Sequence, residues 1–256
     1  MVKLVNPIEE RRQYGPLGAV WHACKVVFNR KAPVFQRLFS FFDKLLFLIF
    51  NYMDSAIDRK YGIETSGIVS ANNLEANSEN LRYAVWYEPM PEKIFRRIMG
   101  YLNIDFGAFE FIDFGSGKGR VLIMAAPYGF KKVTGVEFSP ELHRIAANNI
   151  EIYRQHTHTS TIESVCMDAV HFPIPEAPLV MFFYSPFTGN ALAQVLTNIS
   201  ASLRRNPRDI VLLLYGSNPY TLAQFQSTGF RCTELTCSAD WWTFQKYRSF
   251  LFKSRQ

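Results

Sequence analysis

A glycine-rich loop between an apolar run and a helical run constrains the fold more than any other feature. Residues 109–113 read Phe-Glu-Phe-Ile-Asp, the pattern of a short buried strand. Gly-Ser-Gly-Lys-Gly follows at 115–119, and a helical pattern then covers 120–126. Glycine lets the backbone approach a ligand closely. A strand, such a loop and a helix in succession predict an α/β fold that binds a ligand where the strand ends.

The spacing within this loop separates the classes of ligand. The glycines follow a GxGxG pattern, whereas dinucleotide-binding loops follow GxGxxG. The loop is not a phosphate-binding P-loop either, because Lys118 is followed by Gly119 instead of Ser or Thr. Asp113 ends the strand, and its carboxylate would repel a pyrophosphate. These residues therefore favour a cationic ligand.

Strand and helix patterns alternate after the loop. Further strands are predicted at 132–137, 162–167, 178–184 and 210–215, with helices starting after Ser139 and covering 189–203. Alternating strands and helices predict a parallel sheet with helices on both faces. Residues 230–252 contain two strand-like stretches without a clear helix between them. This closing pair predicts an antiparallel strand at the edge of the sheet.

The glycine loop and its acidic neighbour resemble the first motif of class I S-adenosylmethionine-dependent methyltransferases. The matching positions are Asp113, Gly115, Ser116, Gly117 and Gly119, which the resemblance implies wrap the methionine part of the cofactor. The resemblance covers about residues 85–252. It implies a Rossmann-like, seven-stranded sheet, mostly parallel with an antiparallel last strand. It also implies S-adenosylmethionine as the cofactor and S-adenosylhomocysteine as the product.

Two further acids stand at the ends of the next two predicted strands. Glu137 matches the family's second acidic position, which binds the ribose hydroxyls. Asp168 matches the third, which contacts the adenine amino group, and Ala169 would offer a backbone N–H to the ring. Each acid alone could instead form a turn or cap a helix. Three acids at successive strand ends, together with GxGxG, favour a cofactor site.

Ser185-Pro-Phe187 follows the fourth predicted strand. It resembles a shortened form of the fourth motif of amino-directed methyltransferases, in which one proline is missing. The resemblance implies that Ser185 accepts a hydrogen bond from an amine and that Phe187 stacks on that amine. The alternative is a turn that shapes the pocket without contacting the acceptor.

A second resemblance lies upstream, in Tyr87-Glu-Pro-Met-Pro91 and the helix that is predicted to start at Pro91. This layout is similar to lysine methyltransferases of the histone-core type and of the mitochondrial ATP-synthase-subunit type, which place a tyrosine-containing loop over the cofactor. It implies a catalytic role for Tyr87 and a cofactor contact for Glu88. The alternative is that Tyr87 and the neighbouring aromatic residues serve only in packing.

The chain is predicted to divide into an N-terminal helical extension or lid at 1–104 and a cofactor-binding domain at 105–256. Residues 33–60 form a helical pattern with a wide apolar face. That face could cover the main domain, form a dimer contact, or contact a membrane surface through 33–53. The longest apolar run is Leu45–Phe50, far short of the roughly 20 residues that span a membrane. No spanning segment is therefore expected.

Cysteine usage and charge bear on location and partners. The 4 cysteines form no CxxC pair, so neither a disulfide framework nor a metal site is expected. Reduced thiols favour a cytoplasmic protein. The net charge of +6 could serve an anionic partner, but no RNA-binding module is apparent, so nucleic acid is less favoured.

These features predict an S-adenosylmethionine-dependent methyltransferase. The favoured acceptor is an amine, either a protein lysine or a small-molecule amine. Two alternatives stay open, namely a small-molecule O-methyltransferase of secondary metabolism and a methyltransferase-like binding module without catalysis.

Overall fold

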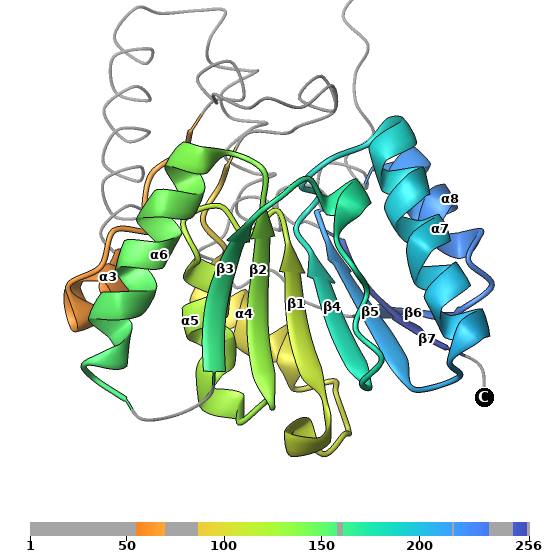
Figure 1. Cartoon of the computed structure of the whole chain (residues 1–256), viewed down its shortest axis with the longest axis horizontal. Helices are drawn as coiled ribbons and strands as arrows, with labels where there is room; N and C mark the ends of the chain where they lie inside the picture. The colour runs from red at the N-terminus through yellow and green to blue at the C-terminus, as the bar shows by residue number, and fades with distance from the viewer. Residues whose placement is uncertain (1–54, 70–86, 158–160, 217, 236–247, 255–256) are drawn as a thin grey trace, which may run out of the picture. The chain divides into compact units, whose positions relative to one another are not determined.

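The computed structural model describes residues 55–69, 87–157, 161–216, 218–235 and 248–254 (Figure 1). Described residues up to Leu235 and from Ser249 onward belong to one compact unit. The predicted helix at 33–60 lies outside the described residues except for its last turns, and so does the membrane contact predicted for 33–53. The lid and the domain boundary at 104–105 stay predictions. In the part of the chain that the structure describes, no helix is both long and apolar enough to cross a membrane.

Seven strands form one sheet in the order β3-β2-β1-β4-β5-β7-β6. The strands are β1 (Glu110–Phe114), β2 (Lys132–Glu137), β3 (Thr161–Cys166), β4 (Leu179–Phe183), β5 (Ile210–Tyr215), β6 (Arg231–Leu235) and β7 (Ser249–Lys253). The pairs among β1 to β5 are parallel, and β7 runs antiparallel to both of its neighbours. The predicted α/β, Rossmann-like sheet, mostly parallel with an antiparallel last strand, is confirmed.

The place of the antiparallel strand differs from the prediction. β7 lies between β5 and β6, so β6 forms the edge of the sheet. The physical reason is that β7 is more apolar than β6. β7 is buried along nearly its whole length, whereas four of the five residues of β6 are exposed. Strands that are apolar on both faces belong inside a sheet, and polar strands tolerate an edge.

The helices are α3 (Ala56–Tyr61), α4 (Glu92–Met99), α5 (Arg120–Ala125), α6 (Pro140–Arg154), α7 (Gly189–Arg205) and α8 (Pro219–Gln226). The described residues also form the short 3-10 turns η3 (Phe106–Ala108), η4 (Ala126–Tyr128) and η5 (Ala169–His171). Helix α6 starts as predicted, because the Ser139 side chain accepts a hydrogen bond from the Leu142 N–H at 3.4 Å.

Helix α8 was absent from the sequence prediction. Its start carries a recognisable signal, since the Asn218 side chain accepts from the Thr221 N–H at 2.9 Å and Pro219 occupies the first turn. The helix is short, and only Thr221 and Phe225 within it are buried. So few buried positions produce a weak periodicity, which explains the omission.

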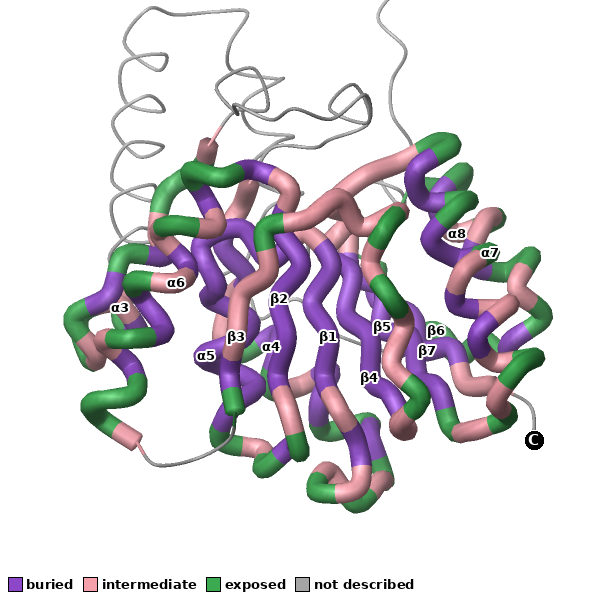
Figure 2. Tube along the Cα trace, viewed as in Figure 1, coloured by how far each residue is buried: buried purple, intermediate pink, exposed green. Residues whose placement is uncertain are grey.

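The core lies on both faces of the sheet, which Figure 2 shows as buried strands between helices with exposed outer surfaces. On one face Phe95 of α4 packs edge-on against Phe111 and Phe182, at centroid distances of 6.3 and 5.7 Å. On the other face Phe183 stacks on Phe114 at 5.0 Å and meets Phe225 of α8 at 5.1 Å. Successive strand residues thus serve opposite faces, as the pleat requires.

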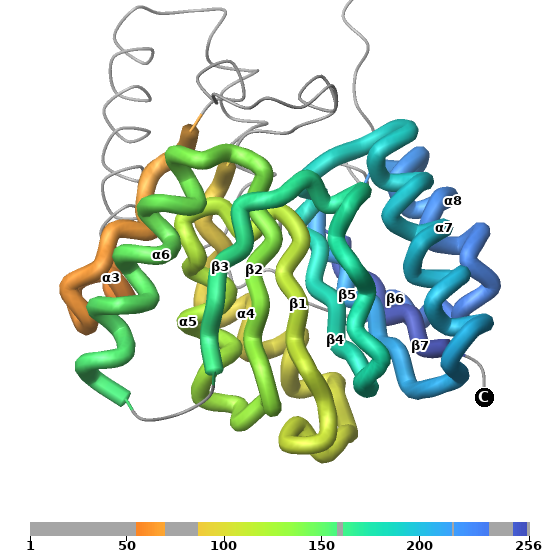
Figure 3. Tube along the Cα trace, viewed as in Figure 1, coloured from red at the N-terminus to blue at the C-terminus, as the bar shows by residue number. Residues whose placement is uncertain are grey.

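This topology determines where a ligand can bind. The chain order reverses at β1, which has β2 on one side and β4 on the other (Figure 3). Because β1 to β5 are parallel, their carboxyl ends lie at the same edge of the sheet. Open α/β sheets bind ligands at that edge, at such a switch point.

Candidate cofactor and acceptor site

Two segments contact the glycine loop that follows β1. Gly115, Gly117 and Gly119 have φ angles of 76°, 53° and 81°, a region that favours glycine. A Cβ atom at Gly115 would lie 2.1 Å from the Cβ of Pro186, and one at Gly117 would lie 2.2 Å from the ring of Tyr87. Glycine is therefore required both by the backbone and by the close approach of two neighbours. Those neighbours belong to the two segments predicted to serve the acceptor.

Asp113 and Glu137 are buried at the ends of β1 and β2, each with 3% of its surface exposed. One carboxylate oxygen of Glu137 accepts from the Gly117 N–H at 2.8 Å, and the other accepts from the Ser139 N–H at 2.9 Å. Glu137 thereby connects the glycine loop to the start of α6. The structure thus brings together Asp113, Glu137 and the loop, as predicted.

The electrostatics of these two acids favour a cation. Burial raises the pKa of Asp113 well above its usual value, and the negative charge of Glu137 raises it further. Burial also raises the pKa of Glu137, although its backbone hydrogen bonds oppose the shift. Among the described residues, neither carboxylate forms an ion pair. A bound positive charge would compensate this buried negative charge.

Asp168 follows β3 at the same edge of the sheet. The Met167 N–H donates to the Glu137 carbonyl at 2.9 Å, which holds the β3 end beside β2. The Asp168 carboxylate accepts from the Val170 N–H at 3.0 Å and starts η5, in which Ala169 is half-buried. Asp168 therefore shapes the turn. The adenine contacts of Asp168 and Ala169 stay predictions.

Ser116 directs its hydroxyl toward the sheet. The hydroxyl is buried, has no hydrogen-bond partner among the described residues, and lies where a Cβ atom at Gly135 would be only 2.6 Å away. The Ser116 N–H donates to the Val136 carbonyl at 3.2 Å. Gly135 therefore leaves room for Ser116 beneath the loop. The predicted cofactor contact of Ser116 stays untested.

Ser185 and Phe187 lie in the loop after β4, beside the glycine loop. Among the described residues other than glycine, Ser185 alone has a positive φ, at 40°. Its hydroxyl donates to the carbonyls of Gly216 and Tyr215, the latter at 3.3 Å. Phe187 is half-buried and packs against the core. Backbone strain of this kind concentrates at functional sites.

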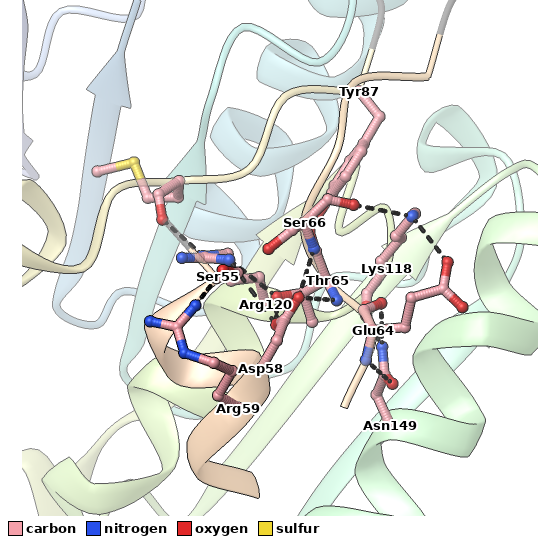
Figure 4. Close-up of polar contacts among 11 residues, drawn as sticks. Ser55, Asp58, Arg59, Glu64, Thr65, Ser66, Tyr87, Lys118, Arg120 and Asn149 are labelled. Carbon is pink, nitrogen blue, oxygen red and sulfur yellow. Dashed lines mark hydrogen bonds and ion pairs between the residues drawn. The ribbon is translucent and has the colours of Figure 1, made fainter. Parts of the chain in front are cut away.

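Tyr87 is held over the glycine loop (Figure 4). Its N–H and carbonyl pair with Val69 at 2.9 and 3.1 Å, and its hydroxyl donates to the Thr65 carbonyl at 2.6 Å. Glu88 follows Tyr87 and is half-buried. The catalytic role of Tyr87 and the cofactor contact of Glu88 stay predictions.

Two buried cations, one within the loop and one directly after it, were missed by the sequence reasoning. The Lys118 ammonium donates to the Glu64 carboxylate at 3.1 Å and to the Ser66 carbonyl at 3.0 Å. The Arg120 guanidinium donates to the Met90 carbonyl at 2.9 Å. Both side chains form hydrogen bonds with residues in the range 64–90, which precede the glycine loop in the chain, as drawn in Figure 4. The only sequence signal was the presence of basic residues in and directly after a glycine loop, which does not reveal where they point.

The candidate site at the carboxyl ends of the strands therefore consists of the glycine-loop backbone and the carboxylates of Asp113 and Glu137. In the described ranges, no group of three His, Cys, Asp or Glu side chains is placed to hold a metal ion.

A family model for a methyltransferase domain matches residues 111–206. A protein from Saccharolobus islandicus (strain REY15A) named protein-lysine N-methyltransferase is 39% identical over 66 residues. That match spans 25% of this chain and 40% of the relative's length.

Solved structures give more distant similarities. The ribosomal protein L11 methylase from Lactobacillus delbrueckii subsp. bulgaricus is 14% identical with a TM-score of 0.45, and the alignment covers 64% of this chain and 77% of that chain. The precorrin-6y C5,15-methyltransferase from Geobacter metallireducens GS-15 is 13% identical with a TM-score of 0.46, and the alignment covers 76% of this chain and 100% of that chain.

The domain match, the strand order and the geometry of the glycine loop agree. They confirm the predicted resemblance: residues 111–206 form a methyltransferase domain of the class I, S-adenosylmethionine-dependent type.

Proposed function

We propose that this chain transfers the methyl group of S-adenosylmethionine to an amine, with a protein lysine as the favoured acceptor. The observation that carries the proposal is the contact of two separate segments with one loop. Pro186 packs against Gly115, and the ring of Tyr87 lies against Gly117. The two segments predicted for the acceptor thus border the loop predicted for the cofactor.

The residues present fit the cofactor. When bound, S-adenosylmethionine supplies an electrophilic methyl group on a positively charged sulfur. Asp113 provides a buried negative charge beside the loop, which suits a cationic ligand. The carboxylate of Glu137 accepts backbone hydrogen bonds on both oxygens and, with about four lone-pair sites, keeps capacity for a bond that a ribose hydroxyl could donate.

The geometry of Ser185 favours an acceptor that donates hydrogen bonds. Its single hydroxyl proton is given to backbone carbonyls, so its oxygen can only accept further bonds. An amine N–H meets that requirement and keeps its nitrogen lone pair for the methyl group. The role of Ser185 is thus to orient the amine, since an in-line displacement depends on alignment.

A lysine acceptor must also lose its proton. With a reference pKa of ~10.4, roughly one lysine in 2,500 is neutral at pH 7. The half-buried rings of Tyr87 and Phe187 would border the acceptor and exclude water. Desolvation of this kind lowers the pKa of an amine. The similarity to a protein named protein-lysine N-methyltransferase supports the same acceptor.

The test uses S-adenosylmethionine with a labelled methyl group, purified protein and fractionated cell lysate. We expect label in the protein fraction that is lost on protease treatment and recovered as methyl-lysine after hydrolysis. The matched control is Asp113→Asn, which removes the buried charge and should incorporate no label above background. It separates this enzyme's activity from contaminants.

The alternatives give different results. Label on oxygen in small metabolites would overturn the lysine acceptor and support the O-methyltransferase. Cofactor binding without label in any fraction would support the non-catalytic module. Failure of the purified protein to bind S-adenosylmethionine or S-adenosylhomocysteine would overturn the proposal as a whole.

A further inference from the structure

Arg120 is a buried cation at the start of α5, directly after Gly119. Its side chain is 3% exposed. The guanidinium donates to the Met90 carbonyl at 2.9 Å and to the Thr65 hydroxyl at 3.0 Å, with an Asp58 carboxylate oxygen at 3.9 Å (Figure 4). A buried guanidinium is tolerated only when its N–H groups and charge are compensated. All of these partners belong to the segment upstream of the methyltransferase domain.

Two of these partners, Asp58 and Thr65, belong to one hydrogen-bonded segment, residues 58–66 (the turn at Thr65), in which Thr65 is fully buried. The Asp58 carboxylate accepts from the N–H groups of Thr65 and Ser66 at 2.9 and 2.8 Å, and also from the Thr65 hydroxyl. The Thr65 carbonyl in turn accepts the hydroxyl of Tyr87 at 2.6 Å. Thr65 therefore connects the buried cation to the ring that lies on the glycine loop.

We propose that Arg120 is a positioning residue, which holds the ring of Tyr87 against Gly117 through the turn at Thr65 and so keeps the glycine loop ready for the cofactor. The inference rests on the proposed function, because it assigns a role in the same site. It concerns a residue outside the GxGxG and acidic positions of that site.

The physical basis is preorganisation. Gly117 has a φ of 53°, and its N–H already donates to Glu137. The ring of Tyr87 occupies the space into which this glycine could otherwise move. If the turn at Thr65 shifts, Tyr87 loses its hydroxyl anchor and the loop gains conformations. Those conformations must then be lost again on binding, which weakens affinity.

The test compares Arg120→Gln with Arg208→Gln. Arg208 also donates to backbone carbonyls, but it lies at the amino ends of β4 and β5, away from the glycine loop. Its guanidinium donates to the carbonyls of Ala177 and Asn206 at 2.9 and 2.8 Å. For each variant, calorimetry measures the dissociation constant for S-adenosylhomocysteine, and thermal unfolding measures stability. We expect both variants to unfold at lower temperature, but only Arg120→Gln to bind about tenfold more weakly. An unchanged dissociation constant in Arg120→Gln would overturn the inference.

A double-mutant cycle with Tyr87→Phe separates positioning from general stability. Tyr87→Phe removes the hydroxyl that donates to Thr65 and keeps the ring on the loop. If Arg120 acts through Tyr87, the two losses of affinity overlap, and the double variant binds little more weakly than Arg120→Gln alone. Fully additive losses would show that Arg120 acts by another route and would overturn the inference.

Two further results keep the test decisive. If Arg120→Gln does not fold, Thr65→Val replaces it, because this near-isosteric change removes the hydroxyl that accepts from Arg120 and leaves the carbonyl for Tyr87. It should then weaken binding a few-fold, and unchanged binding would overturn the inference. Wild-type protein that does not bind S-adenosylhomocysteine would overturn the proposed function, and this inference with it.

Discussion

Asp58 and Asp113 differ in whether the protein itself compensates their negative charge. Asp113 comes before the glycine loop, and Asp58 lies near Arg120, which directly follows that loop. Asp58 accepts from two backbone N–H groups and a hydroxyl and lies near the guanidinium of Arg120. Asp113 is buried beside a second acid, and among the described residues it has no ion pair. One carboxylate is satisfied by the protein itself. For the other, we propose that the bound cofactor supplies the positive charge.

This difference shows how burial should be interpreted. A buried carboxylate whose partners are all within the chain stabilises the fold, because its removal leaves those partners unpaired. A buried carboxylate without positive partners destabilises the free protein, and it contributes to stability only when a cation binds beside it. The same substitution, Asp to Asn, should therefore have opposite effects on stability at the two positions.

The largest effect is expected for Asp58→Asn. The amide oxygen can keep the two N–H groups, which donate to one carboxylate oxygen, but the amide nitrogen then replaces the oxygen that accepts from the Thr65 hydroxyl. Arg120 also loses its carboxylate neighbour. Breaking a buried charged contact of this kind lowers the free energy of unfolding by about 3 kcal/mol. Urea denaturation measures it, with the exposed Glu141→Gln as a control. A loss at Asp58 no larger than at Glu141 would contradict the interpretation of this turn.

Asp113→Asn should separate stability from binding. Affinity for S-adenosylmethionine should fall about 100-fold, which corresponds to roughly 2.7 kcal/mol, because a buried charged contact to the cation is lost. The free protein should be as stable as the wild type, or more stable by about 1 kcal/mol, because an uncompensated buried charge is removed. Calorimetry and urea denaturation measure the two quantities. If both decreased together, the contrast with Asp58 would disappear.

The stability of the free protein should depend on pH through Asp113. Its pKa is raised in the folded protein, so the protonated form is favoured there. The resulting stability is fully present below the unfolded pKa of ~3.9 and is lost as pH rises through the folded pKa, at about 1.4 kcal/mol per unit of pKa difference. Glu137 acts in the same direction.

The difference between wild type and Asp113→Asn isolates the contribution of Asp113 from that of Glu137. Denaturation at several values between pH 4 and pH 8 should show the wild type losing stability relative to the variant as pH rises. Parallel curves would mean that Asp113 has an ordinary pKa in the folded protein.

The smallest effect is expected for Glu64→Gln. Glu64 pairs with Lys118 at 3.1 Å, but its side chain is 73% exposed. Exposed ion pairs contribute little, so the change in the free energy of unfolding should stay within about 0.5 kcal/mol. Binding of S-adenosylhomocysteine should also be unchanged, since Lys118 keeps the Ser66 carbonyl. A larger decrease in the free energy of unfolding or in affinity would mean that the contacts of Glu64, like those of Asp58, stabilise the fold.

How much of this could be predicted from the sequence depends on the range of the interactions. The β1–loop–α5 unit and the acids at strand ends follow from local patterns, and the structure brings Asp113 and Glu137 to one edge. The contacts of Arg120 with Met90 and Thr65 join residues 30 and 55 positions apart. No local periodicity encodes such a contact. The hydroxyl direction of Ser185 likewise depends on Gly216, 31 positions away.

The position of β7 has a consequence for how the chain is made. Residues 249–253 supply the hydrogen bonds that join β5 to β6. In a nascent chain that ends at Leu235, β5 and β6 are both made but β7 is not, so nothing joins them. The backbone of β5, a buried strand, then has no hydrogen-bonding partner on that side. Open apolar edges favour pairing between chains. β7 thus enters the sheet after β5 and β6 have been made, and its insertion closes the open edge of β5.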